Sequence, residues 1–230
     1  RSRGVDLAVA CPIASHCGAR FAAAGVPIVD IDLRRSFDGR SIRAFRRLLR
    51  NGRYDIVHAF SGRLLQNSLI ASAGLPVRVI AYRGIVGNVS FFDPVSWFRF
   101  LNPRISRIVC VAEAVRDFFR SMQPAFLRVP DRKLVTIYKG HDVDWYRQPP
   151  VDRVRLGLPA DAFVVCCVAN YRPRKGIEVL VEAFARLPEE WRAHLLLVGH
   201  MDAPLLTRAI EASRAAARIH RVGYRDDAPA

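Results

Sequence analysis

Lysine is scarce in this sequence, and no apolar run is long enough to cross a bilayer. Of the 36 basic residues among 230, three are lysine, so arginine carries almost all of the net charge of +15. No apolar stretch approaches the roughly 20 residues of a membrane helix, and residues 1–10 lack the apolar core of a signal peptide. With 51% hydrophobic and 25% charged residues, the composition is that of a globular chain and excludes a disordered or fibrous one.

Cysteine is also infrequent and shows no metal or redox pattern. The sequence contains neither a CxxC pair nor a Cys/His cluster with zinc spacing, so no metal site is predicted. An odd number of cysteines in mostly apolar runs favours buried, reduced thiols of a cytoplasmic protein. The five are Cys11, Cys17, Cys110, Cys166 and Cys167.

The excess of positive charge is compatible with a nucleic acid, an anionic membrane or a phosphorylated substrate. Nucleic-acid binders usually cluster their charge, whereas these arginines are scattered apart from a concentration at residues 40–53. There, Ile42, Phe45, Leu48 and Leu49 recur at helical spacing, which predicts an amphipathic helix with a solvated basic face. We expect no nucleic-acid partner, and a non-catalytic polyanion- or nucleic-acid-binding α/β protein is the alternative.

Short apolar runs alternate with helical patterns along the chain, which indicates a doubly wound α/β architecture. Most of the runs are continuous, as is typical of strands buried in a parallel sheet. No G-x-G-x-x-G follows any of them, which disfavours a dinucleotide-dependent oxidoreductase. The predicted strands are 5–10, 27–33, 55–60, 77–82, 107–111, 134–138, 163–168, 194–198 and 219–222; the predicted helices are 18–24, 41–51, 64–73, 94–100, 112–122, 176–187 and 205–217.

A diproline stretch, YRQPPV at residues 146–151, interrupts this alternation and predicts a domain boundary near residue 148. Six strands precede it and three follow, and three strands are few for a closed α/β domain. The sequence starts at Arg1 and stops soon after a strand-like run. We therefore expect a fragment of a longer protein.

The strongest local signal is the basic loop NYRPRKG at residues 170–176, between a predicted strand and a predicted helix. Backbone N–H groups and the helix dipole favour a phosphate at such a position. Arg172 and Lys175 add hydrogen-bond donors and charge, and Gly176 permits close approach of the backbone. This loop is a candidate anion site.

An ordered set of six stretches resembles family 4 retaining glycosyltransferases of the GT-B fold. Residues 168–188, VANYRPRKGIEVLVEAFARLP, resemble the start of that family's donor-binding domain, with its strand, arginine-containing loop, P-x-K-G and helix. The other stretches resemble family motifs in the same order along the chain. They are YDIVHAF (54–60), RISRIVCVAEAVRDFF (104–119), KLVTIYKGHDVDWY (133–146), HLLLVGH (194–200) and RIHRVGYRDD (218–227).

The resemblance implies a role for particular residues on the donor side. Lys175 would contact the diphosphate of a nucleotide sugar and offset the charge of the leaving group, which is electrostatic catalysis. The family's partner arginine is matched by Asn170, and Arg172 would supply the charge from a shifted position. The implied diphosphate-binding residues are Asn170, Arg172, Lys175, Gly176 and Gly199, and those near the nucleotide base are Gly223, Tyr224 and Arg225.

On the acceptor side the sequence departs from the family pattern. The histidine of the family's T-x-H motif is matched by Arg83 in VRVIAYRG, followed by Gly84. Arginine stays protonated and cannot act as a base, so a catalytic Arg83 would bind an anionic acceptor group or the phosphate, the leaving phosphate itself serving as base. Phe60 replaces the second histidine of H-x-H, which leaves His58 as an acceptor-side candidate or a core histidine.

Residues 85–101, IVGNVSFFDPVSWFRFL, are unusually aromatic, and Asp93–Pro94 predicts the start of a short helix. We call residues 85–101 the aromatic segment. Its aromatic side chains either pack into the core or form an acceptor-side surface that enters a membrane interface.

Two family landmarks are absent from the 230 residues: a glycine-rich loop, expected before residue 5, and an E-x7-E pair, expected after residue 230. A chain without both is expected to be inactive alone.

The resemblance thus implies two Rossmann-like α/β domains of GT-B type, with parallel sheets and helices on both faces, the second incomplete. Residues 1–148 would form the acceptor-side domain without its first strand, and residues 149–230 the first half of the donor-binding domain. The implied reaction transfers a sugar with retention from a nucleotide sugar to a glycan, lipid-linked or lipopolysaccharide-type acceptor. We expect no metal or other cofactor, and a cytoplasmic protein or one held peripherally at the inner, anionic face of a bacterial membrane.

Overall fold

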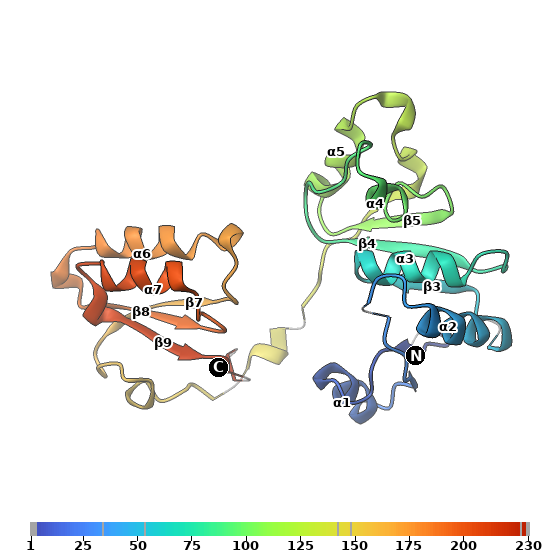
Figure 1. The fold of residues 1–230 in the computed structure, drawn as a ribbon. Coiled ribbons are helices and arrows are strands. Elements are labelled where there is room, and N and C mark those ends of the chain that lie inside the picture. The colour runs from blue at the N-terminus through green and yellow to red at the C-terminus, as the bar shows by residue number, and fades with distance from the viewer. Residues whose placement is uncertain are drawn as a thin grey trace. The chain divides into compact units, whose positions relative to one another are not determined.

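The computed structural model describes residues 4–33, 35–52, 54–141, 143–147, 149–225 and 227–228. The chain forms two compact units, Arg1–Lys139 and Gly140–Ala230 (Figure 1). The division lies a few residues before the position near 148 where the sequence pattern changes.

The first unit contains six parallel strands in two sheets. Strands β1 (Val9–Ala10) and β2 (Ile28–Val29) pair with each other, and the four other strands form a sheet in the order β3-β4-β5-β6. All of these ladders are parallel, so the chain returns through helices between strands. The strands of the larger sheet are β3 (Ile56–Ala59), β4 (Arg78–Arg83), β5 (Ile105–Cys110) and β6 (Leu134–Thr136).

Local sequence signals set the ends of the helices in this unit. The Asp38 side chain accepts hydrogen bonds from the backbone N–H groups of Arg40 and Ser41 and starts α2. Ser61 caps α3 in the same way through the N–H of Leu64. The helices are α1 (His16–Ala23), α2 (Gly39–Asn51), α3 (Gly62–Ala71), α4 (Pro94–Trp97) and α5 (Glu113–Ser121), with 3₁₀ turns at Ala125–Leu127 and Asp131–Lys133.

Two apolar clusters hold the first unit together. Phe45 and Leu49 of α2 pack with Leu33 and Ala71, and Ile42 and Leu48 join this cluster, which confirms the predicted apolar stripe of that helix. The larger cluster joins strands β3–β6 to α3 and α5, with Phe119 fully buried at its centre. The sheet β3–β6 is therefore the rigid frame of the unit.

The aromatic segment divides between core and surface. Phe100 and Leu101 are buried in the larger cluster, whereas Phe92 is 93% exposed and Phe98 is 54% exposed. Asp93 starts α4, as predicted, because its carboxylate accepts hydrogen bonds from two backbone N–H groups and from the Ser96 hydroxyl. Part of the segment therefore packs into the core, as the first interpretation expects, and part faces solvent. Entry of the exposed rings into a membrane interface stays a prediction.

The second unit contains a three-stranded parallel sheet in the order β7-β8-β9 (Phe163–Val168, Ala193–Val198, Ile219–Gly223). Helices α6 (Ile177–Ala185) and α7 (Pro204–Glu211) connect these strands and lie on the same face of the sheet (Figure 1). The 3₁₀ turns here are Val143–Tyr146, Val154–Leu156, Pro173–Lys175, Glu189–Trp191 and Ala216–Arg218.

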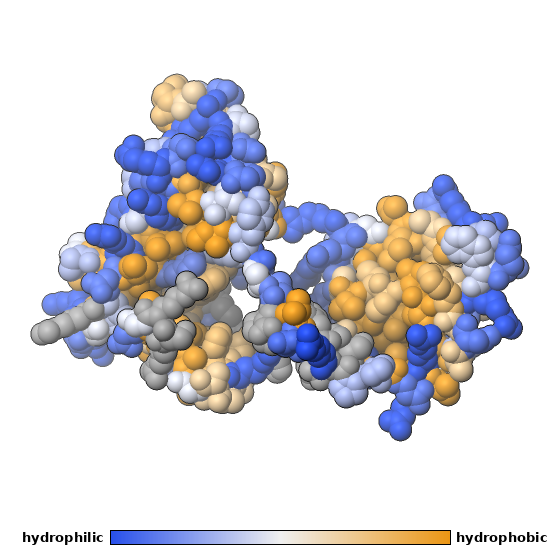
Figure 2. Space-filling view, turned by 180° about the vertical axis from the view of Figure 1, so that it is seen from behind, coloured by the Kyte–Doolittle hydropathy of each residue, from blue (hydrophilic) through white to orange (hydrophobic). Residues whose placement is uncertain are grey.

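The two faces of this sheet are covered unequally. On one face, α6 and α7 pack on Leu195 and Leu197 in a closed cluster. On the other, Leu196 and Val198 pack with residues 156 and 158 of a connecting segment, and no α-helix covers this face within the described residues. Phe163 and Val168 stay exposed, and apolar side chains gather on the surface of this unit (Figure 2).

All nine predicted strands and all seven predicted helices have a counterpart among the described residues, with shifted ends for every element except strand 163–168. The prediction of buried thiols is confirmed for Cys110 and wrong for Cys17 and Cys166, which are exposed, while Cys11 and Cys167 are partly buried. All five are free, and burial raises the pKa of the Cys110 thiol to about 11. Cys166 and Cys167 alternate across β7, so the neighbour that faces the helices is Cys167.

Candidate functional site

The carboxyl ends of β7, β8 and β9 lie together and carry most of the predicted donor-side residues. Backbone hydrogen bonds continue past the strands: the N–H of Ala169 donates to Val198, that of Tyr171 to His200, and that of Gly199 to Gly223. The carboxyl ends of parallel strands are where α/β proteins place ligands. We call the residues at this position, 169–176, 199–200 and 223–225, the carboxyl-edge site.

Asn170 and Gly199 meet at the centre of the carboxyl-edge site. The Asn170 Oδ1 atom accepts a hydrogen bond of 3.0 Å from the backbone N–H of His200. Gly199 is buried with φ 126°, and a Cβ atom there would lie 2.8 Å from the carbonyl carbon of Ala169 and closer still to its oxygen. The chain's own backbone therefore already requires glycine at this position, independently of any ligand.

The basic loop forms the turn that leads into α6. Pro173–Lys175 is a 3₁₀ turn, and Gly176 adopts the left-handed conformation (φ 63°) at the N-cap position of α6. No side chain caps this end of the helix. Arg172, Arg174 and Lys175 are exposed. The charge of Lys175 acts on the Cys167 thiol, where it opposes the rise in pKa that burial causes. The loop thus presents three cations beside the start of α6, as the sequence predicted for an anion site.

Tyr171 and Glu178 order the same loop. The Tyr171 hydroxyl donates a hydrogen bond to the Glu178 carboxylate in the first turn of α6. This bond lowers the pKa of Glu178 and raises that of Tyr171. The carboxylate is therefore held by the phenol instead of extending toward the cations of the loop.

His200 is a member of the carboxyl-edge site that sequence reasoning missed. Its imidazole stacks on the ring of Tyr224, with 5.4 Å between ring centroids and 15° between planes. Both side chains are exposed. The signal available in the sequence was its position directly after Gly199 at a strand end. Arg225, also predicted near a nucleotide base, donates two hydrogen bonds to the Asp227 carboxylate.

In the first unit, Arg83 ends β4 and is 7% exposed. Its guanidinium donates to the carbonyl oxygens of Ile85 (3.0 Å) and Gly87, and lies 4.6 Å from the centre of the Phe100 ring. In this conformation Arg83 organises the loop that begins at Gly84 and leads into the aromatic segment. Its direct contact with an anion stays a prediction.

His58 lies on an exposed aromatic row that crosses β3 and β4, and not in the core. The ring of His58 lies 4.3 Å from that of Phe60, which lies 5.4 Å from that of Tyr82. The Lys139 ammonium sits 5.6 Å from the Tyr82 ring. Desolvation lowers the pKa of His58 below its ordinary value, which favours a neutral imidazole able to accept a hydrogen bond at neutral pH. Its acceptor-side role stays a prediction.

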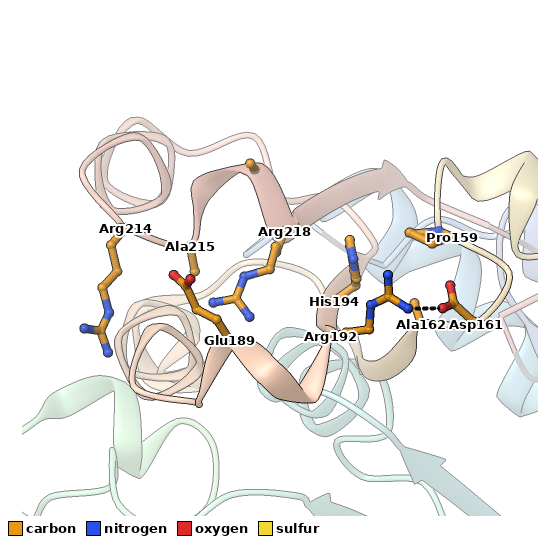
Figure 3. Close-up of a pocket in the computed structure, with 10 residues that line it drawn as sticks. Pro159, Asp161, Ala162, Glu189, Arg192, His194, Arg214, Ala215 and Arg218 are labelled. Atoms are coloured by element: carbon orange, nitrogen blue, oxygen red, sulfur yellow. Dashed lines mark hydrogen bonds and ion pairs between the residues drawn. The ribbon is translucent and has the colours of Figure 1, made fainter.

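Two cavities lie elsewhere, at the amino-terminal ends of the strands. One, of about 470 Å³, is lined by Asp161, Glu189, Arg192, His194, Arg214 and Arg218 of the second unit, with an ion pair between Arg192 and Asp161 (Figure 3). The other lies in the first unit. Neither contains a predicted site residue. The carboxyl-edge site is an open surface within its own unit.

Within the part of the chain that the structure describes, no three His, Cys, Asp or Glu side chains group as metal ligands would. The described helices are all too short or too polar to cross a bilayer.

The fold defines the class of protein. The crystal structure of Anabaena Alr3699/HepE in complex with UDP-glucose matches 95% of this chain and 62% of its own, with a TM-score of 0.73 at 19% identity. That of WaaG, a glycosyltransferase involved in lipopolysaccharide biosynthesis, matches 99% of this chain and 64% of its own, with a TM-score of 0.64 at 16% identity. Two α/β units with parallel sheets are the fold of GT-B glycosyltransferases.

Residues 1–145 match Glycosyltransferase Family 4, and the chain belongs to that family. A relative, the D-inositol 3-phosphate glycosyltransferase of Xylanimonas cellulosilytica, is 36% identical over 95 residues, which are 38% of this chain and 21% of that protein. The chain therefore spans about a fifth of this curated relative's length in the matched region, and less than two thirds of the HepE chain.

Proposed function

We propose that the protein transfers a sugar from a nucleotide-sugar donor, with the second unit binding the donor and the first unit the acceptor. The observation that carries this proposal is the carboxyl-edge site, where three exposed cations adjoin the start of α6 and His200 stacks on Tyr224. Cations beside a helix N-terminus suit a diphosphate, and an exposed aromatic pair suits a nucleobase. HepE, of the same fold, has been crystallised with UDP-glucose.

Each residue has a defined part in this proposal. Lys175 and Arg172 bind the diphosphate, and Lys175 stabilises the negative charge that develops on the phosphate as the sugar leaves. Asn170 and Gly199 hold the ends of β7 and β8 together, as their contacts require. Gly176 allows the turn before α6. Gly223, Tyr224 and Arg225 form the base side, with His200 added from the geometry.

We propose a glycan, lipid-linked or lipopolysaccharide-type acceptor and transfer with retention. Support comes from the exposed part of the aromatic segment, where Phe92 and Phe98 face solvent and Phe37 packs edge-on against Phe98 at 6.1 Å. Aromatic side chains beside arginines suit an anionic membrane interface, where a lipid-linked acceptor would lie. Arg83 acts here by holding the loop between β4 and this segment, with Gly84 at its start and His58 on the neighbouring strand.

The topology also supports the expected additional strand in the first unit. Strands β1 and β3 share no ladder in the described residues, and each ends its sheet. A two-stranded pair with two residues in each strand is too small to be stable alone. We propose that a further parallel strand pairs with both and joins the two sheets.

The donor proposal is tested by titrating the chain with UDP-glucose and other nucleotide sugars, observed by ligand NMR. Lys175→Ala is expected to weaken binding of the preferred donor about ten- to hundredfold, the effect of one lost charge-assisted contact. The matched control is Arg208→Ala, which removes one exposed charge from α7 in the same unit. Equal affinity of the Lys175→Ala and unaltered chains would remove Lys175 from the site.

The membrane contact is tested separately by sedimentation with vesicles that contain phosphatidylglycerol. Replacing Phe92 and Phe98 by Ser is expected to reduce the bound fraction, because both rings are exposed and their loss does not open the core. Replacing Val154 and Val179 by Ser, also exposed apolar residues, is the control. Equal loss in both variants would contradict a specific contact of the aromatic segment.

A further inference from the structure

The cavity of the first unit has a composition unlike that of the rest of the surface. It has a volume of about 480 Å³, within the roughly 300–1,000 Å³ range of small-ligand pockets. Four cationic residues and no carboxylate line it, together with apolar side chains. The lining residues on which the argument rests are Arg78, Arg104, Arg107, Lys133, Ile56 and Ile80. We call this the amino-edge cavity.

The amino-edge cavity lies at the end of the sheet opposite Arg83. Ile56 and Arg78 begin β3 and β4, and Ile105 begins β5. Arg83 ends β4, five residues after Arg78, which places the two ends roughly 16 Å apart at the rise of a strand. The amino-edge cavity is therefore separate from the predicted acceptor-side residues of the same unit.

Three of the four cations of the amino-edge cavity donate hydrogen bonds to neutral oxygens. Arg104 donates to the Leu69 carbonyl at the end of α3 (2.5 Å), Arg107 to its neighbouring carbonyl at Ser106 (2.8 Å), and Lys133 to the Pro103 carbonyl (2.7 Å). None of these four cations forms an ion pair in the described part of the chain. Through its hydrogen bond to the Leu69 carbonyl, Arg104 caps the C-terminal end of α3. A neutral carbonyl does not cancel a charge, so the positive charge of the cavity stays uncompensated.

Lys133 is the cation most removed from water. Burial lowers its pKa, and the charges of Arg132 and Arg107 lower it further. The nearby Asp131 carboxylate does not offset this charge, because it forms ion pairs with Arg116 and Arg120 instead. A partly buried lysine among guanidinium groups favours a negatively charged partner from outside the chain.

We propose that the amino-edge cavity binds a phosphate-bearing ligand as a second anion site of this protein. Arg78 and Arg107 are exposed at its rim and offer planar donors that match phosphate oxygens. Lys133 supplies a point charge inside. The isoleucine side chains provide an apolar wall for the body that carries the phosphate. The phosphate belongs either to a soluble ester or to a phospholipid headgroup, and both present the same chemistry to these residues.

The proposal is tested by calorimetric titration of the 230-residue chain with sodium pyrophosphate. The Lys175→Ala background removes one of the three loop cations of the carboxyl-edge site, and the dependence of binding on Arg78 and Arg107 separates the outcome from the proposed donor function. In this background we expect saturable binding, weakened at least about tenfold by Arg78→Gln with Arg107→Gln. The control is Arg47→Gln with Arg50→Gln, an equal loss of charge from exposed positions of α2, which should change the affinity less than about twofold.

Arg78→Gln alone is the variant least able to affect folding, since this side chain is exposed and makes no hydrogen bond within the described residues. Vesicles with and without phosphatidylglycerol then separate the two sources of phosphate. Vesicle binding that depends on Arg78 and Arg107 assigns the lipid headgroup, and pyrophosphate binding without it assigns a soluble ester. Absence of both, or equal weakening by the α2 control, overturns the proposal.

Discussion

Gly199 offers the sharpest test of how the carboxyl-edge site is built. A Cβ atom at this position would lie 2.8 Å from the carbonyl carbon of Ala169, below the 3.0 Å that real Cβ contacts respect, and closer still to the oxygen. The obstacle is backbone that already bonds to Val198, so it cannot move like the end of a flexible side chain. Gly199→Ala must therefore separate the ends of β7 and β8 or strain the chain.

The expected loss of folding free energy in Gly199→Ala has two parts. The left-handed φ of 126° is unfavourable for alanine and costs about 1–3 kcal/mol, while overpacking against fixed atoms costs about 1–3 kcal/mol more. Gly157→Ala provides the matched control in the same unit, because φ is +74° there and the nearest atom to a Cβ is 3.9 Å away. The difference between the two variants reports the clash together with the greater backbone cost of φ 126° for alanine.

Differential scanning calorimetry measures this difference. We expect the transition of the second unit to lie about 5–20 °C lower in Gly199→Ala than in Gly157→Ala, using about 4–8 °C per kcal/mol for a unit of this size. The transition of the first unit should be unchanged in both. Equal shifts in the two variants would refute the reasoning, because they would show that the backbone conformation alone, and not the contact with Ala169, requires glycine.

Three further predictions follow from other contacts. Phe119→Ala should lower the folding free energy of the first unit by about 3–5 kcal/mol, since this ring is fully buried there. Calorimetry should show a lower transition temperature for that unit alone. A shift of both transitions would contradict separate units. Arg83→Met removes a buried guanidinium from two loop carbonyls and should destabilise the first unit by about 2–4 kcal/mol, detected by urea unfolding; a change below 0.5 kcal/mol, about the scatter of surface substitutions, would contradict this role. Burial, and then the neighbouring His194 at 2.9 Å, hold the pKa of His220 below its ordinary 6.5, so the unfolded chain binds a proton at higher pH than the folded one. Stability of the second unit should therefore be fully present above about pH 6.5 and fall as the pH drops below it, and a fall of equal steepness in His220→Gln would exclude this cause.

The order of strands and helices could be predicted from the sequence because it depends on local patterns. Strand 163–168 was predicted to the residue, since a run of β-branched and small apolar residues between turn signals admits one interpretation. Strands 5–10 and 27–33 were predicted too long, and the structure pairs two residues of each. Their extent depends on hydrogen-bond partners, which the local pattern does not contain.

The candidate site was predicted in part for the same reason. The loop at 170–176 could be found because a basic stretch between a predicted strand and a predicted helix can be recognised from the order of residues alone. The stacking of His200 on Tyr224 could not be found in this way, because these residues follow different strands and meet only when β8 pairs with β9. The contact between Gly199 and Ala169 likewise depends on the pairing of β7 with β8.

Sequence alone determined the two-part α/β organisation, the basic loop before α6 and the resemblance to Family 4, since each depends on residue types at fixed spacing along the chain. Tertiary structure alone decided which charges are compensated. Arg83 became a buried support for a loop, whereas Arg78, Arg107 and Lys133 came together at one end of a sheet without a carboxylate. The physical reason is that the environment of a charge is set by the atoms within a few ångströms of it, and these come from segments distant in sequence.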